Sequence, residues 1–169
     1  YNLIVDKGRE FELSHCGMFA MDTMRMEKGY VHWGHDMSPE ENQYEAGLKF
    51  AISFKKNIDF IGKRAIEKIR KEKIKKKMVM LTLKNSSPGS PLLLHDEPIY
   101  CDDKIIGRTT SGNYSFNYNK NMSFGYINLI YTTDELLSKN LFIEVEKKKY
   151  EAVVLKQALH DPENKIIKS

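Results

Sequence analysis

The sequence predicts an α+β protein in which a mainly helical part precedes a small antiparallel β-barrel. Apolar residues recur at helical spacing before a lysine run at residues 71–77 and alternate with a period of two after it. Closely spaced strand-like segments then follow, which is typical of a small barrel. With 169 residues, of which 41% are hydrophobic, the chain can bury a substantial core. We place a domain boundary between residues 1–74 and 75–169.

The first part begins with two helical segments. Residues 2–13 resemble the end of a helix without a start signal, so we expect the chain to be part of a longer protein. Methionines recur every third residue at Met18, Met21 and Met24. This spacing predicts a helix over residues 17–28, and Gly29 ends it because glycine readily adopts the left-handed cap conformation.

Three further elements are expected before the lysine run. Ser38-Pro39-Glu40-Glu41 has the composition of a capping box and predicts a short helix that ends near Gly47. Alternation of Phe50, Ile52 and Phe54 predicts a strand over residues 49–54. Asp59 is expected to cap a third helix, whose apolar stripe contains Ile61, Ala65, Ile66 and Ile69.

The second part contains the strands expected to form the barrel. The apolar run at residues 78–83 predicts a strand that is covered on both faces. Residues 85–91 predict a loop, and residues 98–101 and 104–109 predict a hairpin. Tyr114, Phe116 and Tyr118 are expected to face Met122, Phe124 and Tyr126 across a turn at residues 119–121. Two final strands are expected at residues 141–146 and 149–155.

Composition restricts the function classes. Cys16 and Cys101 lie far apart and flank no ligand pattern, which favours a reduced, cytoplasmic protein without a disulfide framework or a metal site. No apolar run reaches the length of a spanning helix, so no membrane association is expected. The net charge is +4, and residues 71–77 are interpreted as a solvated helix end. The alternative, a nucleic-acid patch, lacks interleaved aromatic side chains, so no nucleic-acid partner is expected.

A possible ligand surface lies at Tyr30 to His35. The rings of Tyr30 and Trp33 suit stacking against a planar ligand, whereas the alternative is that they close an interface within the protein. His32 and His35 are three residues apart, but no third ligand follows at a suitable spacing. We therefore expect them to form hydrogen bonds within the loop.

The sequence resembles the glycine-cleavage T-protein (aminomethyltransferase) superfamily over nearly its whole length. The matching segments are residues 17–35 (GMFAMDTMRMEKGYVHWGH), 45–48, 59–63, 109–115 (TTSGNYS), Lys120 and 124–127. The branch it resembles most is the C-terminal folate region of dimethylglycine and sarcosine dehydrogenases. The resemblance implies the end of a folate-binding aminomethyltransferase-like domain, followed by the antiparallel barrel.

The resemblance also implies one-carbon chemistry. In this family a methylamine-derived carbon passes to tetrahydrofolate, which forms 5,10-methylenetetrahydrofolate. In the dehydrogenase branch, FAD in an upstream domain first oxidises the amine. The family's acidic residue near the reaction centre and its pterin-contacting glutamate lie upstream of the matched residues, so no catalytic residue is assigned and the activity of the chain alone stays open. If the source is eukaryotic, the mitochondrial matrix is the expected compartment.

Four residues are expected at the folate surface: Met21, Arg25, Tyr30 and Trp33. Many aminomethyltransferases carry Ala-Arg-Asp where this chain has Ala20-Met21-Asp22, so a folate tail carboxylate must pair with another cation or remain unpaired. Arg25 is the nearest alternative, but it is also a natural partner for Asp22 or Glu27. Tyr30 aligns with an aromatic position that faces folate in family members.

The sequence is also compatible with two other functions. One is a glycine-cleavage aminomethyltransferase, against which the missing arginine counts. The other is a nonenzymatic module that binds folate or nucleic acid. The leading interpretation is the folate-linked region of a dehydrogenase-like enzyme, with the upstream portion of the same protein as its partner.

Overall fold

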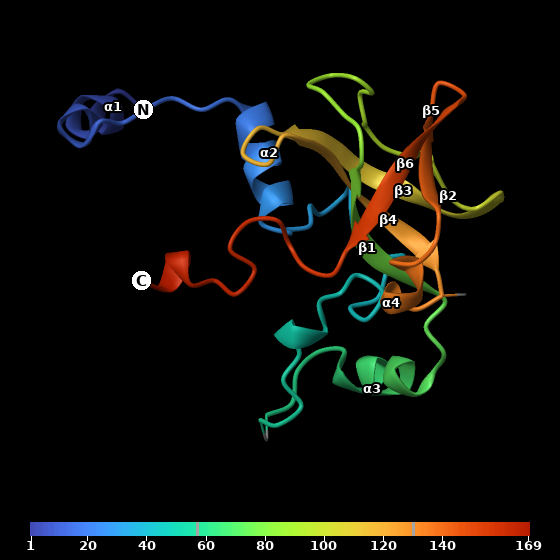
Figure 1. Ribbon diagram of the computed structural model, residues 1–169. Helices are drawn as coiled ribbons and strands as arrows, with labels where there is room; N and C mark the ends of the chain where they lie inside the picture. The colour runs from blue at the N-terminus through green and yellow to red at the C-terminus, as the bar shows by residue number, and fades with distance from the viewer. Residues whose placement is uncertain (57, 130) are drawn as a thin grey trace.

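The computed structural model describes residues 1–56, 58–129 and 131–169, and it contains a closed antiparallel β-barrel (Figure 1). The strands are β1 (Lys76–Leu83), β2 (Pro98–Cys101), β3 (Lys104–Ser115), β4 (Lys120–Asn128), β5 (Leu141–Val145) and β6 (Lys148–Leu155). Their order around the barrel is β1-β4-β3-β2-β5-β6, and β6 pairs back with β1. The α+β class and the terminal barrel are confirmed.

Helices lie outside this barrel. They are α1 (Asn2–Gly8), α2 (Met18–Glu27), α3 (Lys63–Lys71) and α4 (Thr133–Leu136), with single 3-10 turns at Arg9–Phe11, Lys49–Ala51 and Ile166–Lys168. Figure 1 shows α2 beside the barrel, whereas α1 and α3 lie further from it. The helix expected at residues 17–28 is therefore confirmed, and Gly29 follows it with a φ of +79°. No helix of the described residues is long and apolar enough to cross a bilayer.

Two apolar clusters lie on the two faces of β1, one inside the barrel and one between the barrel and α2. Val79, Leu81 and Leu83 of β1 belong to the buried cluster of the barrel. Met80, on the opposite face of β1, packs in a second cluster with Met26 of α2. The strand is thus covered on both faces, as its apolar run predicts. Complete burial of the Met26 side chain contributes about 2 kcal/mol to stability and fixes the inner face of α2.

The segment between α2 and α3 differs from the prediction. Residues 38–47 form turns without a helix, although Glu41 accepts hydrogen bonds from both the backbone N–H and the hydroxyl of Ser38. The carbonyl of Glu45 accepts a bond from the backbone N–H of Met78, which ties this segment to β1. The predicted strand at residues 49–54 is also wrong, because the segment contains a 3-10 turn and Phe50 is 84% exposed.

The third helix starts later than expected. Asp59 accepts a hydrogen bond from the backbone N–H of Phe60, and α3 begins only after Gly62, whose φ is +88°. Ile61 lies outside the helix and is exposed, whereas Ile66 is buried. The lysine run also differs from a simple helix end, because α3 ends at Lys71 and β1 begins at Lys76.

In the second part, the loop, the first hairpin and the two final strands lie where they were predicted. The β3–β4 hairpin has a different register: Tyr114 pairs with Asn121, and Phe124 pairs with Ser111. Phe116 and Tyr118 lie in the connecting turn, where Phe116 is exposed. The predicted aromatic row across the hairpin is therefore wrong, although Tyr114 itself is buried.

Candidate functional site

A cleft of about 510 Å³ lies between α2, the loop that follows it and the barrel. Three of the four predicted site residues line this cleft, namely Met21, Arg25 and Tyr30. Trp33 does not line it. The remaining lining residues are Met18, Phe19, Asp22, Val31, His32, His35, Leu92, Leu93, Leu94, His95, Thr110, Ser111, Gly112 and Asn113.

The wall of the cleft is mainly apolar. Met21 and Tyr30 are each about half exposed, at 52% and 53%, so both side chains are accessible to a ligand. Leu93 is buried beneath the surface, and Leu92 and Leu94 are exposed on either side of it. Such an open apolar wall with a few polar groups suits a flat aromatic molecule.

Arg25 anchors this wall. Its Nε donates to Asp22 Oδ1 at 2.6 Å, and its Nη1 donates to Asp36 Oδ2 at 2.6 Å. The same Nη1 also donates to the carbonyl of Tyr30, and Nη2 donates to Ser111 Oγ at 3.0 Å. Arg25 therefore joins α2, the loop and β3. The predicted pairing with Asp22 is confirmed, and the two carboxylates offset its positive charge.

Asp36 is the buried counterpart of Arg25. Besides Arg25, its Oδ2 accepts a bond from the backbone N–H of His32 at 2.8 Å, and its Oδ1 accepts one from Thr110 Oγ1 at 2.6 Å. The pair is almost fully desolvated, since the side chains of Arg25 and Asp36 are 15% and 0% exposed. Charge-assisted hydrogen bonds in such surroundings fix geometry strongly.

A bulge in β3 allows the barrel to hold both partners. The β3–β4 register shifts between Thr109 and Ser111. Successive residues of a regular strand point to opposite faces, but a bulge redirects a side chain. Here Thr110 reaches Asp36, while the next residue, Ser111, reaches Arg25. The barrel thus positions the loop that carries Tyr30.

The carboxyl end of α2 is fixed by three further contacts. Glu27 is buried and accepts bonds from Ser115 Oγ at 2.6 Å and Asn117 Nδ2 at 2.7 Å. Lys28 Nζ forms an ion pair with Asp161 Oδ2 at 2.9 Å in the C-terminal segment. These contacts hold the turn immediately before Tyr30.

Trp33 and the two histidines lie in the next part of the loop. Trp33 is 62% exposed, and its backbone bridges to Met37. The rings of His32 and His35 stack with their centroids 4.8 Å apart. Within the described ranges, no three histidine, cysteine, aspartate or glutamate side chains gather as a metal site.

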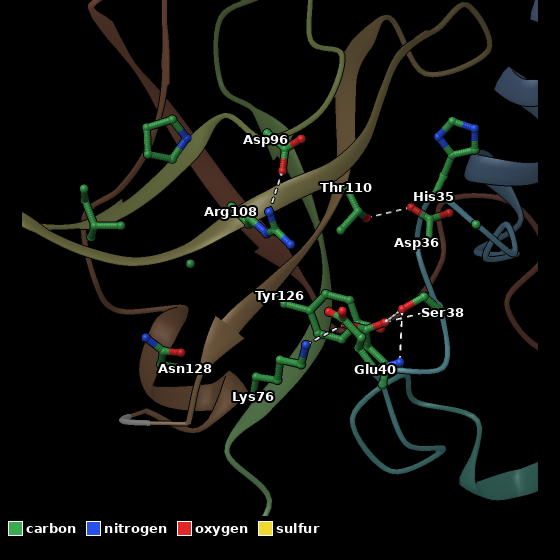
Figure 2. Close-up of a pocket in the computed structure, with 15 residues that line it drawn as sticks. His35, Asp36, Ser38, Glu40, Lys76, Asp96, Arg108, Thr110, Tyr126 and Asn128 are labelled. Carbon is green, nitrogen blue, oxygen red and sulfur yellow. Dashed lines mark hydrogen bonds and ion pairs between the residues drawn. The ribbon is translucent and has the colours of Figure 1, made fainter.

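A second hollow, of about 540 Å³, shares His35 and Thr110 with the cleft (Figure 2). Two ion pairs line it, Lys76 with Glu41 at 2.6 Å and Arg108 with Asp96 at 2.9 Å. Burial and the nearby carboxylates, Glu41 first among them, raise the pKa of the Tyr126 phenol, so it stays protonated. None of the predicted site residues lines this hollow.

Several cleft residues were not found from the sequence. Leu93 and Ser111 lie far from α2 along the chain, and only barrel closure brings them to it. Asp36 could have been identified from the sequence as a buried partner of Arg25, because it is a carboxylate within a loop of aromatic and histidine side chains. The motif at residues 109–115 also contains Thr110 and Ser111, but periodicity alone does not show that the bulge turns both toward the same pair.

Comparisons with known proteins agree with this architecture. The model of the GCVT N-terminal domain matches residues 1–56, and that of the glycine cleavage T-protein C-terminal barrel domain matches residues 76–161. Mitochondrial dimethylglycine dehydrogenase from Homo sapiens is 31% identical over 159 residues, which are 94% of this chain and 18% of that protein. An aminomethyltransferase from Listeria innocua serovar 6a is 34% identical over 161 residues, which are 92% of this chain and 42% of that protein.

A solved structure shares the fold. The glycine cleavage system aminomethyltransferase T from Bartonella henselae superposes with a TM-score of 0.72 at 20% identity, covering 85% of this chain and 38% of that one. The chain therefore spans less than half the length of each of these proteins. The barrel model alone covers half of the sequence, and the predicted resemblance is confirmed. The chain belongs to the glycine cleavage T-protein family.

Proposed function

We propose that this chain is the tetrahydrofolate-binding C-terminal region of a one-carbon transfer enzyme that resembles dimethylglycine or sarcosine dehydrogenase. In the complete protein, a methylamine-derived carbon would be transferred to tetrahydrofolate to form 5,10-methylenetetrahydrofolate. The observation that carries this proposal is the apolar cleft of a T-protein family member, in which Met21, Arg25 and Tyr30 come together.

The chemistry of the cleft fits the aromatic part of folate. Tyr30 offers a half-exposed ring, and Met21 offers a polarisable thioether beside it. The charge of Arg25 is already offset by Asp22 and Asp36. We therefore assign Arg25 to holding Tyr30 in place, and Tyr30 and Met21 to direct contact. Trp33 stands outside the cleft and is proposed as a secondary contact only. Bound tetrahydrofolate would supply the acceptor for the one-carbon unit.

Three features of the complete protein belong to this proposal. An upstream domain would hold FAD and oxidise the amine. Residues 1–74 would complete a folate-binding domain together with upstream sequence, and residues 75–169 would form the separate barrel domain. The protein would act in the mitochondrial matrix if its source is eukaryotic, as the name of the human relative indicates for that protein, and in the cytoplasm otherwise.

An aminomethyltransferase is the second candidate. Its support is the 34% identity to the Listeria innocua protein, of which the chain covers a larger share than of the human dehydrogenase. Met21 counts against it, because a methionine cannot pair with a carboxylate where many aminomethyltransferases have an arginine.

The two candidates differ in the source of the transferred carbon. The test supplies the complete protein with tetrahydrofolate and either dimethylglycine or sarcosine plus an electron acceptor, or the aminomethylated carrier of the glycine cleavage reaction. We expect 5,10-methylenetetrahydrofolate from the methylamine. Product from the carrier alone would favour the second candidate. Folate binding without turnover of either substrate would support a nonenzymatic module, and absence of folate binding would overturn the proposed function.

A further inference from the structure

The second hollow, of about 540 Å³, is lined by a tyrosine whose hydroxyl group has no hydrogen-bond partner among the described residues (Figure 2). This residue is Tyr126 of β4, which is only 7% exposed. A buried hydroxyl without a partner costs free energy, so native structures keep few of them unless a bound molecule completes the hydrogen bond. Because burial raises the pKa of the Tyr126 phenol, the group stays protonated and can donate to an oxygen that enters the hollow.

The charged side chains around this hollow leave one carboxylate unmatched. Three of the carboxylates that line it already have a basic partner, and these pairs are Glu41–Lys76, Asp96–Arg108 and Asp36–Arg25. The remaining one, Glu40, is exposed, and within the described part of the chain its carboxylate takes part in no ion pair. The backbone N–H of Glu40 bonds to Ser38 Oγ, which fixes the start of its side chain. A cationic group in the hollow can therefore pair with Glu40.

The two basic residues that line the hollow differ in how firmly they are held. Lys76 Nζ pairs with the nearly buried Glu41 and lies 4.8 Å from the centroid of the Tyr126 ring. Arg108 lies directly opposite Tyr126 in the β3–β4 register, so the two side chains share one face of the sheet. Its pair with Asp96 is exposed on both sides, so water screens that pair and the guanidinium can still meet a second carboxylate. Arg108 and Tyr126 therefore offer a place for an anionic group.

We propose that the second hollow binds a small zwitterion of the amino-acid class, whose ammonium group pairs with Glu40 and whose carboxylate lies between Arg108 and the Tyr126 hydroxyl. A simple anion would leave Glu40 unmatched, and a simple amine would leave the Tyr126 hydroxyl unpaired, so neither satisfies both groups. The hollow has a volume within the range of small-molecule sites, about 300–1,000 Å³. This inference goes beyond the proposed function, because it concerns a ligand other than folate and residues outside the cleft.

The test compares three probes on the complete protein by calorimetry. Glycine carries both charges, acetate carries the carboxylate alone, and ethanolamine carries an ammonium group with a neutral hydroxyl. None of them has an N-methyl carbon, so the proposed transfer reaction does not consume them during the titration. The variants are Glu40→Gln and Tyr126→Phe, and the matched control is Glu146→Gln, which removes an exposed carboxylate from the turn between β5 and β6. Thermal unfolding checks the fold, and Tyr126→Phe should melt no earlier than the wild type because its hydroxyl has no partner.

We expect the wild type to bind glycine about tenfold more tightly than acetate or ethanolamine. Glu40→Gln and Tyr126→Phe should each weaken glycine binding about fivefold, whereas Glu146→Gln should leave it within about twofold. No glycine binding, or the same affinity in both hollow variants as in the wild type, would overturn the site. Equal affinities for acetate and glycine would overturn the zwitterion in favour of a simple anion. Tetrahydrofolate titrated into the same proteins tests the proposed function separately, since Glu40 and Tyr126 do not line the cleft.

Discussion

Arg25 Nη1 donates to Asp36 Oδ2 at 2.6 Å, and this buried pair connects the helix that lines the cleft to the loop that carries Tyr30. The barrel contributes to the same pair through Thr110 and Ser111. Three parts of the chain that are distant in sequence therefore share one polar cluster. The geometry of this polar cluster sets the position of the apolar wall of the cleft.

Asp36→Asn should destabilise the protein by about 3 kcal/mol, because it leaves the guanidinium of Arg25 without its buried counter-charge. Urea denaturation measures the change. The matched control is Asp6→Asn, which removes the same charge from an exposed pair with Arg9 and should cost less than about 1 kcal/mol. Similar losses in the two variants would show that the buried pair has no special role.

Tyr30→Ala should weaken tetrahydrofolate binding several-fold, since loss of one aromatic contact costs about 1 kcal/mol. Trp33→Ala should have a smaller effect because Trp33 does not line the cleft. Both rings are more than half exposed, so neither change should greatly affect thermal unfolding. Calorimetry and melting curves on the complete protein measure the two effects. If Tyr30→Ala keeps its folate affinity but melts much earlier, the ring has a packing role.

The Lys28–Asp161 pair should contribute stability that depends on pH. The hydrogen bond from Lys28 lowers the pKa of Asp161 from its ordinary value of 3.8 to about 2. Because the folded pKa is depressed, the contribution is present above about pH 4 and is lost as the pH falls through about 2. Asp161→Asn should therefore melt earlier than the wild type at about pH 6.

That difference in melting temperature should close as the pH approaches about 2. Asp103→Asn, in an exposed and longer ion pair with Lys149, serves as the control and should show little difference at any pH. A constant difference between wild type and Asp161→Asn across this range would contradict the assignment.

The 169-residue chain alone should not oxidise dimethylglycine or sarcosine. Under the proposed function, the flavin domain and the acidic residue expected at the reaction centre would both lie in upstream sequence. Reduction of an electron acceptor, measured with added flavin and tetrahydrofolate, should therefore stay at background and appear only with the longer protein. Turnover by a preparation shown to be free of longer enzyme would refute this expectation.

The strands were largely predictable because each is a local pattern closed by local turns. The run at residues 78–83 has apolar side chains on both faces, and the structure packs Leu81 in the barrel and Met80 against α2. Element type was less predictable between α2 and α3. Ser38 and Glu41 make the expected capping contacts, but the carbonyl of Glu45 bonds to Met78 in β1. This tertiary hydrogen bond therefore determined the conformation of a segment whose local signals favoured a helix.

The candidate site was predictable where its residues lie on one helix and its following turn. Met21, Arg25 and Tyr30 meet in the cleft, as their shared segment suggests. Alternation failed for Phe116, which lies in the turn of the hairpin because β3 ends at Ser115. Register depends on turn length and on the bulge, and neither is encoded in a two-residue repeat.

Closure of the barrel has a consequence for association with other chains. Since β6 pairs with β1, each strand of the described chain has a hydrogen-bonded neighbour on both sides, and none lies at the open end of a sheet. An open edge would recruit foreign strands through its free backbone groups and promote aggregation. This barrel must instead recognise its neighbours through side chains and loops, so its specificity can change by surface substitution while the hydrogen-bonded wall stays the same.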